Sequence, residues 1–430
     1  MNNNTKKNNY TANSIETLDI MTHIRHRPGM YISSNTIDGR HHVALEVISN
    51  SIDEYLNGYG DKISIFLEKD GFIAIGDNGR GVPIGIHPSG KSVLQAVFDT
   101  ANTGGKFNNN GEAGYNTSGG MNGIGAKATN ATSEYFEATT MRDGKIEKVV
   151  FKRGKLIDHT IEDCESDNTG TLVRFKPDSE VFIDGIELDY NRLNKQIQEL
   201  AFLCSGLDFT LVDVVNQRQE HYKYDNGIID YVNYLGKDKK HISDIFYCKS
   251  HEGRVGVEIG LQYNDTYSDS YKLYTNNIPN SSGTHLTGLR TALTRAMNEF
   301  ARDKKILKDK EANLTGDDLK EGLTFVLSLK MPDPVFSGQT KDVLNSPEGR
   351  TIVEQLVAKE IRLWLDGNPQ SGKAIVEKAL LARRAREAAK KAREATRKKA
   401  VGGFSAVLPG KLADCQSKDV DECEIYLVEG

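Results

Sequence analysis

The stretch Ala44-Leu-Glu-Val-Ile-Ser-Asn-Ser-Ile-Asp-Glu54 decides how the rest of the chain is interpreted. On an α-helix, side chains three and four residues apart share a face, so acidic and amide groups gather on one side and branched apolar groups on the other. The polar side carries no Lys or Arg to balance its carboxylates, and Asn is a mediocre helix former in mid-helix. Both facts favour a functional stripe over the ordinary solvated face of an amphipathic helix. The stripe consists of Glu46, Asn50, Asp53 and Glu54.

Composition limits the kinds of protein that this chain can be. Its 430 residues carry a net charge of −5, and its apolar and charged fractions (38% and 27%) are typical of a globular protein. No apolar run approaches the roughly 18–20 residues of a membrane span, and the N-terminus lacks the apolar core of a signal peptide. The scattered cysteines form no CxxC pair, which predicts reduced thiols, and His41 and His42 are expected at the surface or in a loop. We therefore expect a cytoplasmic protein of roughly two to four domains without a membrane partner.

The first half of the chain alternates helical and strand patterns around glycine-rich loops. Residues 15–31 predict a helix that Pro28-Gly29 ends. Residues 103–127 are poor in apolar side chains and rich in Gly and Asn, which favours a functional lid or disorder. The other predicted elements are a helix at 40–57, strands at 62–68 and 72–75, a helix at 92–101, and mostly strands from 134 to 225 with a helix at 190–203.

A second unit runs from about residue 230 to residue 405. Its long predicted helix, 371–400, would measure about 45 Å. From Lys373 to Lys399 this helix has eleven basic and three acidic residues, a local charge of +8. It is either a solvated helix with a narrow apolar edge or a basic surface that faces DNA phosphates. The other predicted elements are a helix at 286–301, a strand at 323–331 and a polar loop at 336–341.

Two glycine clusters follow the acidic stretch, in an order typical of a nucleotide site. Asp77 ends a predicted strand, where its carboxylate can accept a hydrogen bond from an exocyclic amine such as that of adenine. Gly79 and Gly81 let the backbone pass close to a ring. Gly119–Gly125 can wrap phosphates with N–H groups, helped by a helix expected to start after Gly125. We infer that the acidic stripe holds Mg-ATP and activates the water that cleaves it.

Two stretches imitate the P-loop pattern GxxxxGK[ST]. Gly85-Ile-His-Pro-Ser-Gly-Lys-Ser92 matches it, but a P-loop follows a buried strand, and the residues before this one are few and interrupted by Pro83. Pro88 also removes an N–H from a nest that would bind phosphate through such groups. The second stretch, Gly367-Asn-Pro-Gln-Ser-Gly-Lys-Ala374, lacks the hydroxyl that Mg²⁺ needs. We expect neither stretch to bind the nucleotide.

Taken in order, the motifs resemble the ATPase region of type IIA DNA topoisomerases, above all the B subunits of bacterial DNA gyrase and topoisomerase IV. The resemblance covers nearly the whole chain. The motifs that carry it are Arg27-Pro-Gly-Met-Tyr31, Glu46 with Asn50, Asp77-Asn-Gly-Arg-Gly81, Gly104-Gly-Lys-Phe107, Ser118-Gly-Gly-Met-Asn-Gly-Ile-Gly125, Asn168-Thr-Gly-Thr171, Thr275-Asn-Asn-Ile-Pro279, Gln339-Thr-Lys341, Leu408-Pro-Gly-Lys-Leu-Ala-Asp414 and Tyr426-Leu-Val-Glu-Gly430.

The resemblance implies an α+β fold, with a GHKL-type (Bergerat) ATPase α/β sandwich followed by an α/β transducer domain that has a long C-terminal helix. It divides the chain into an N-terminal arm (1–14), an ATPase domain (15–229), a transducer domain (230–405) and a linker with the first strand of a truncated Toprim domain (406–430). Glu424–Gly430 has the pattern of a buried strand with nothing after it, so we expect the chain to stop at the threshold of a further domain.

The same resemblance implies roles for the residues of the first part. Glu46 matches the general base for the hydrolytic water, Asn50 the Mg²⁺ ligand and Asp77 the adenine contact. Arg80 would pair with Glu54 at the edge of the pocket. The remaining nucleotide contacts that it implies are Gly79, Gly81, Lys106, Gly119, Gly120, Met121, Asn122, Gly123, Ile124, Gly125, Ala126 and Thr171.

Residues outside the first domain also match. Lys341 resembles the lysine that reaches the γ-phosphate from the second domain, with Gln339 beside it as a catalytic partner. Tyr10 matches the arm residue that touches nucleotide in the other protomer. Glu429 matches a Toprim metal ligand, but its partners are absent here.

The chain departs from the bacterial pattern in the acidic stretch and in the lid. Ser49 stands where the bacterial enzymes usually carry Asp, and Asn116 replaces a lid lysine. Met121-Asn122 and Gly125-Ala-Lys127 are more similar to eukaryotic and phage lids. These differences leave the ATP role intact and leave the choice among gyrase, topoisomerase IV and a phage enzyme open.

The implied cofactors are ATP and Mg²⁺, and the implied partners are double-stranded DNA, a second copy that joins on ATP binding, and a topoisomerase A-type subunit in a heterotetramer. The implied location is the bacterial cytosol or a phage-infected cell. An alternative of another class is a DNA-binding and dimerisation module that holds nucleotide as a static ligand. The related chaperone and mismatch-repair ATPases do not continue into the 408–414 and 426–430 motifs.

Overall fold

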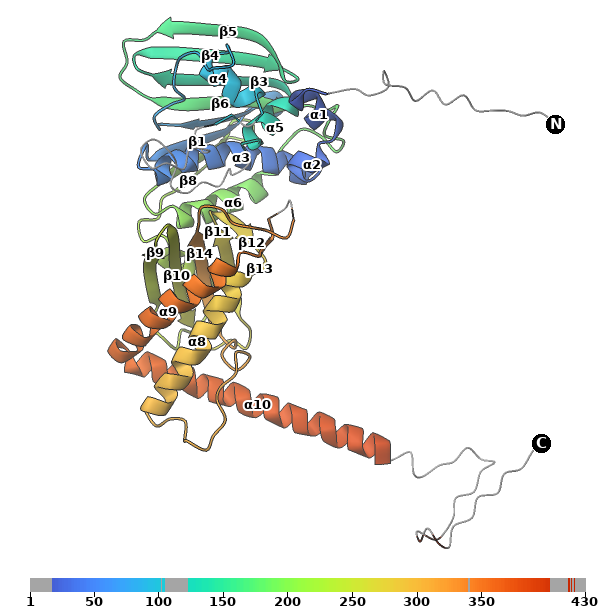
Figure 1. The fold of residues 1–430 in the computed structure, drawn as a ribbon, viewed down its shortest axis with the longest axis vertical. Coiled ribbons are helices and arrows are strands. Elements are labelled where there is room, and N and C mark those ends of the chain that lie inside the picture. Colours follow the sequence, from blue (N-terminus) through green and yellow to red (C-terminus); the bar gives the residue numbers. More distant parts are fainter. Residues whose placement is uncertain are drawn as a thin grey trace, which may run out of the picture.

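The computed structural model describes residues 18–101, 103–104, 123–338 and 341–402, together with residues 417, 419 and 421. The chain forms two stacked parts, each built on a β-sheet, and a long helix projects from the second (Figure 1). Some predicted segments and site residues lie outside the described residues, and their roles stay predictions. They are the arm 1–14, Lys106, Gly119, Gly120, Met121, Asn122, Gln339 and the chain end with Glu429.

The first part is built on an eight-stranded sheet with the order β5-β4-β3-β6-β2-β1-β7-β8. Only β1 and β7 run parallel, and every other neighbouring pair in this sheet is antiparallel. The strands are β1 (Lys62–Leu67), β2 (Ile73–Asp77), β3 (Ser133–Arg142), β4 (Lys145–Lys152), β5 (Lys155–Asp163), β6 (Gly170–Pro177), β7 (Asp208–Asp213) and β8 (Arg218–Tyr222).

Helices cover this sheet and bury its apolar face. The helix predicted at 40–57 is α3, and its residues Val47, Ile48 and Ile52 lie in one core with Ile63 and Ile75 of the β1–β2 hairpin. Burying a side chain of this size stabilises the fold by about 1.5–3 kcal/mol. The helices are α1 (Ile20–His26), α2 (Gly29–Ile32), α3 (Ile37–Leu56), α4 (Val93–Asp99), α5 (Gly125–Ala131) and α6 (Tyr190–Leu203).

The second part has a five-stranded sheet with the order β12-β11-β14-β10-β9 and a short parallel pair, β13-β15. Every residue of β14 except the last is buried, because helices cover both faces of the sheet. The elements are α7 (Ile228–Gly236), β9 (Phe246–Glu252), β10 (Val255–Tyr263), β11 (Ser270–Thr275), β12 (Ile278–Asn280), β13 (Ser282–Gly283), α8 (Thr284–Asp303), β14 (Leu323–Lys330), β15 (Val343–Leu344), α9 (Pro347–Gly367) and α10 (Pro369–Gly402).

Helix α7 joins the two parts. Its residues Ile228, Tyr231 and Val232 belong to the core of the first part, and the helix packs on β10 and β14 of the second. Val326 of β14 faces this helix, whereas its neighbours in the strand belong to the core under α8 and α9. The domain boundary proposed at 229/230 stays a prediction.

The long C-terminal helix is confirmed as α10, which would measure about 51 Å for its 34 residues. Its first half is anchored by buried Ile375, Val376 and Ala379, and the guanidinium of Arg386 donates to both carboxylate oxygens of buried Asp318 at 2.8 and 3.1 Å. From residue 384 to residue 397 every residue is exposed. Figure 1 shows this half extending away from both sheets.

One local expectation was incomplete and another was wrong. Pro28-Gly29 was expected to end a helix, and α1 does end at His26 just before it, but the pair also opens α2, because proline is compatible with the start of a helix. His41 was expected at the surface, but it is a fully buried residue of α3. The imidazole is accommodated because the main-chain N–H of Asp189 donates to its Nε2 at 3.1 Å and the Gln196 side chain lies 3.2 Å from its Nδ1.

Burial gives His41 a consequence for stability in acid. Burial lowers the pKa of His41 from 6.5 to about 4, and the charge of Arg192 adds to this effect. The unfolded chain therefore takes up this proton more readily than the folded chain, so stability present above pH 6.5 is lost as the pH falls toward 4. We expect roughly 2 kcal/mol of unfolding free energy to be lost at pH 5 through this group alone. Urea unfolding at pH 7 and pH 5 measures the loss. His41→Gln should reduce it, and the exposed His251→Gln should not.

Candidate functional site

Helix α3 carries Glu46, Asn50 and Glu54 along one side, and all three are half-buried. Asp53 departs from the predicted stripe, because its side chain is buried (1% exposed). Burial is the main cause of the raised pKa of the Cys204 thiol at the end of α6, and the charge of the Asp53 carboxylate adds to it. Three of the four predicted stripe residues therefore line the accessible side of the helix.

Asp77 stands at the end of β2 with a hydrogen-bond donor on each carboxylate oxygen. Ser51 Oγ donates to Oδ2 at 2.7 Å, and the N–H of Gly79 donates to Oδ1 at 2.9 Å. Burial raises the pKa of Asp77, while these two hydrogen bonds oppose the rise. Each oxygen keeps a second lone pair, so the carboxylate can still accept from an amine. Sequence reasoning missed Ser51, whose only signal was a hydroxyl on the buried side of α3.

Glu54 and Arg80 form the predicted pair. Arg80 Nε and Nη2 donate to the two oxygens of Glu54 at 3.0 and 2.9 Å, a bidentate arrangement that fixes the guanidinium plane. The guanidinium also lies 3.8 Å from the centre of the Tyr59 ring. The pair links the end of α3 to the loop after β2, next to Asp77.

The glycines of this loop are required by close backbone approaches. Gly81 has φ +74°, and a Cβ there would lie 2.6 Å from the carbonyl oxygen of Met141. A Cβ on Gly79 would lie 3.0 Å from Asp77 Oδ1. Thr171 of β6 is the register partner of Asp77, so the structure brings these predicted contacts together at one sheet edge.

The start of α5 lies directly against Glu46. A Cβ on Gly125, the first residue of α5, would lie 1.8 Å from Glu46 Oε2. Only glycine therefore leaves room for the carboxylate in this position. Gly123, Ile124 and Ala126 flank the contact, and the helix begins where it was predicted to begin. Glycine thus places the C-terminal end of the predicted lid, at the start of α5, beside the carboxylate.

The charge of Lys341, from the second part, acts on His42 beside the same carboxylate. His42 Nε2, one turn before Glu46 on α3, is 3.6 Å from Glu46 Oε1. Burial lowers the pKa of His42, the Glu46 carboxylate opposes this, and the positive charge of Lys341 adds to it. The site therefore combines a carboxylate, an imidazole and an ammonium group from both parts of the chain. Sequence reasoning missed His42, although its spacing of four residues from Glu46 was visible.

The P-loop imitations have ordinary structural roles. In the first, Ser92 caps α4 by accepting from the N–H of Gln95 at 3.1 Å, and Lys91 Nζ donates to Asp99 Oδ1 at 2.9 Å. Ile86 pairs with Ser92 in a β-bridge, so this segment closes on itself as a hairpin and follows no buried strand. In the second, Gly367–Ala374 is the corner between α9 and α10.

Lys91→Ala is accordingly expected to leave ATP affinity and turnover close to wild-type. Its ammonium group is engaged by Asp99 at the end of α4 and by Thr100, which follows that helix. Equilibrium titration with ATP measures the affinity, and Lys341→Ala is the matched lysine variant. A large loss of affinity in Lys91→Ala would restore the P-loop interpretation.

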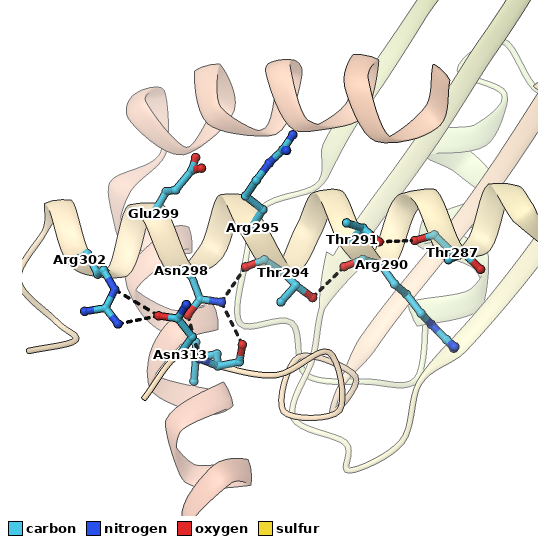
Figure 2. A pocket seen from close by; sticks show the side chains of 10 residues that line it. Thr287, Arg290, Thr291, Thr294, Arg295, Asn298, Glu299, Arg302 and Asn313 are labelled. Carbon is cyan, nitrogen blue, oxygen red and sulfur yellow. Dashed lines mark hydrogen bonds between the residues drawn. The ribbon is translucent and has the colours of Figure 1, made fainter. Parts of the chain in front are cut away.

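A separate open pocket of about 810 Å³ runs along α8 in the second part. Figure 2 shows Arg290, Arg295 and Arg302 along this helix, with Arg302 bonded to Asn313. The pocket does not include the cluster around Glu46. Its lining residues are Thr287, Arg290, Thr291, Thr294, Arg295, Asn298, Glu299, Arg302, Asn313 and Leu314.

Comparison with known proteins matches both parts of the chain. A family of histidine kinase-, DNA gyrase B- and HSP90-like ATPases matches residues 35–181, and the DNA gyrase B family matches residues 227–395. The chain is 44% identical to the DNA gyrase B protein of Clostridium acetobutylicum over 98% of its length and 43% identical to the DNA topoisomerase 4 B protein of Staphylococcus epidermidis over 99%. It spans 66% and 65% of the lengths of these two relatives.

A solved structure is similar over most of the chain. The 43K ATPase domain of Thermus thermophilus gyrase B, in complex with an aminocoumarin, is 34% identical and has a TM-score of 0.74. The match covers 87% of this chain and 97% of that domain. No helix within the described ranges is long and apolar enough to cross a membrane.

Proposed function

The chain belongs to the family of DNA gyrase B and topoisomerase IV B proteins and represents their ATPase region, and from this premise we propose that it works as an ATP-operated DNA clamp. The region binds ATP, as a member of this class of ATPase. The observation that carries the proposal is that the positive charge of Lys341, from the second part, acts on His42, which lies 3.6 Å from Glu46 on α3.

At the reacting end of ATP, Glu46 is the proposed general base for the attacking water. Its carboxylate lies against the first residue of α5, beside the segment 119–126 that we propose to wrap the phosphates. His42 lies one turn away and orients the carboxylate. Lys341, with Gln339, would stabilise charge on the γ-phosphate. Phosphoryl transfer to water depends mainly on such positioning and charge stabilisation, so these groups suffice without a covalent intermediate.

At the other end of ATP, Asp77 is the proposed partner of the adenine amine. Ser51 and the Gly79 N–H hold its carboxylate in a fixed plane. Thr171 lies beside it across the β2–β6 pair, and the Glu54–Arg80 pair closes the edge. Fixing the acceptor before binding reduces the ordering cost of recognition.

Mg²⁺ is a proposed cofactor, with Asn50 as its protein ligand. The amide oxygen of Asn50 is a hard oxygen donor of the kind that this ion prefers, and it lies one turn of α3 from the Glu46 carboxylate. Among the residues that the structure describes, no group of three or more His, Cys, Asp or Glu is placed to hold a metal. Mg²⁺ commonly uses one or two protein oxygens together with water and phosphates. The ion would supply neutralising charge at the phosphates.

Duplex DNA, a second copy of the chain and a topoisomerase A-type subunit are the proposed partners. The exposed half of α10 carries Arg384, Lys390, Lys391, Arg393 and Arg397, which supports a surface for DNA phosphates. The arginines of the α8 pocket add to this charge. ATP would close the dimer around the duplex, with Tyr10 of the arm reaching the other protomer, in the cytosol. In the parent enzyme the cleavage tyrosine would belong to the A-type partner.

The experiment that tests this function measures ATP turnover with and without duplex DNA, and dimerisation with a non-hydrolysable ATP analogue by light scattering. We expect DNA to stimulate turnover and the analogue to produce dimers. Deleting residues 1–14 should weaken that dimerisation. Dimers without any turnover would instead support a static nucleotide-binding module, and failure to bind the analogue would refute the clamp.

A further inference from the structure

The main chain at Lys341 has an unusual conformation that requires support. Lys341 has φ +58°, in the left-handed region that residues with a side chain rarely adopt. Its N–H donates to the carbonyl oxygen of Gly338 at 3.1 Å, and its own carbonyl oxygen accepts from Asn280 Nδ2 at 2.8 Å. Such a conformation persists only where the surroundings fix it. Two adjacent contacts continue the support, since Ser281 N–H donates to the carbonyl oxygen of Asp342 at 2.8 Å and Ser282 pairs with Val343.

Asn280 is built into the sheet so that its amide has one orientation. It ends β12 and is 9% exposed. Thr275 Oγ1, which is fully buried, donates to Asn280 Oδ1 at 2.6 Å. The oxygen of the amide is therefore occupied by a donor, which leaves the NH₂ group to face the carbonyl oxygen of Lys341.

The turn between β11 and β12 also contacts two other segments, the loop that follows β14 and the end of α6. Asn276 and Asn277 have φ +50° and +64°, the conformation of a tight hairpin turn that suits asparagine. The Asn276 side chain donates to the carbonyl oxygen of Met331 and accepts from its N–H, at 2.9 Å each, where the loop leaves β14. The Asn277 amide contacts Cys204 Sγ at 3.8 Å, at the end of α6 in the first part.

We propose that Asn280 is a positioning residue for Lys341: its side-chain amide holds the main chain of Lys341 in the left-handed conformation that directs the ammonium group toward the site on α3. The segment Thr275–Asn280 thus supports the main chain of Lys341. This inference rests on the proposed contact between Lys341 and the γ-phosphate.

The test compares the affinities of a non-hydrolysable ATP analogue and of ADP, because only the first has a γ-phosphate. Lys341→Ala should weaken the binding of the analogue and leave the affinity for ADP unchanged. Asn280→Ala should also leave the affinity for ADP unchanged and should weaken the affinity for the analogue about fivefold to tenfold, which is the usual contribution of one hydrogen bond. Asn280→Asp should lose at least as much affinity for the analogue, because a carboxylate still accepts a hydrogen bond from Thr275 but cannot donate one to a carbonyl oxygen. The double variant Asn280→Ala with Lys341→Ala should lose no more than Lys341→Ala alone.

The matched control is Asn298→Ala. Asn298 is equally buried (7% exposed) and its amide donates to the carbonyl oxygen of Leu314 at 2.9 Å, on the far side of the second part. The Asn298→Ala variant should leave the preference for the analogue over ADP unchanged. If the Asn280 variants do not fold, Thr275→Val removes only the hydroxyl that orients the amide and should shift the preference in the same direction.

The outcomes distinguish a failure of the proposed γ-phosphate contact of Lys341 from a failure of the positioning role of Asn280. An unchanged preference in Lys341→Ala refutes the γ-phosphate contact and, with it, the proposed function of Lys341. A lost preference in Lys341→Ala together with an unchanged one in every folded Asn280 or Thr275 variant refutes the positioning role. Additive losses in the double variant also refute it, because Asn280 would then act by a route that does not involve Lys341.

Discussion

Glu46→Ala is expected to bind ATP with near wild-type affinity and to hydrolyse it about 10²–10⁴-fold more slowly, the usual contribution of a general base. The carboxylate of Glu46 lies against Gly125 and beside His42, at the end of the site where Lys341 also lies. The proposed adenine contact, Asp77, is on a different element and does not depend on it. Binding and turnover should therefore separate.

The measurements are equilibrium titration with ATP and steady-state phosphate release. Glu46→Gln keeps the shape of the side chain but cannot take a proton at neutral pH, so it should lose turnover as Glu46→Ala does. Glu377→Ala on α10, a more exposed carboxylate with one weak partner, Lys373, is the control. Phosphate release at the wild-type rate in Glu46→Ala would remove this residue from the role of base.

Gly125→Ala is expected to lose nearly as much turnover while the protein remains folded. The added Cβ would lie 1.8 Å from Glu46 Oε2, so the carboxylate must leave its position. The obstacle is the far end of a flexible side chain, and alanine is favoured over glycine in a helix, so folding should not suffer. A displacement of about 1 Å at a catalytic group can cost about 10²-fold in rate.

Thermal unfolding and steady-state turnover together test this expectation. The melting temperature of Gly125→Ala should stay near that of the wild type while phosphate release falls. Gly367→Ala, at the end of α9 with no atom within 4 Å of the new Cβ, controls for the general effect of the substitution. Normal turnover in a folded Gly125→Ala protein would show that Glu46 works from a different position.

Local chemistry explains why much of the site was predictable from the sequence. Asp77 at a strand end, Gly81 at a positive φ and Gly125 at a helix start are each dictated by neighbours in sequence, and the structure places them as expected. The pairing of Glu54 with Arg80 was found by resemblance, since no spacing rule joins residues 26 positions apart. The same holds for the approach of Lys341 to the first part.

Tertiary packing explains what was missed. Helix α9 has apolar residues at Val353, Val357 and Ile361, a helical spacing that was available but not used. The environment of His41 depends on α6, which arrives from residues 190–203 and brings Gln196 to its ring. Ser51 reaches Asp77 only because the β2 strand end passes beside the helix.

Helix α7 connects the two parts directly. Its residues Ile228, Tyr231 and Val232 lie in the core of the first part, and the same helix packs on β10 and β14 of the second. A shift of the first sheet would therefore displace β10 and β14 as well, because α7 packs against both parts and is not a flexible linker.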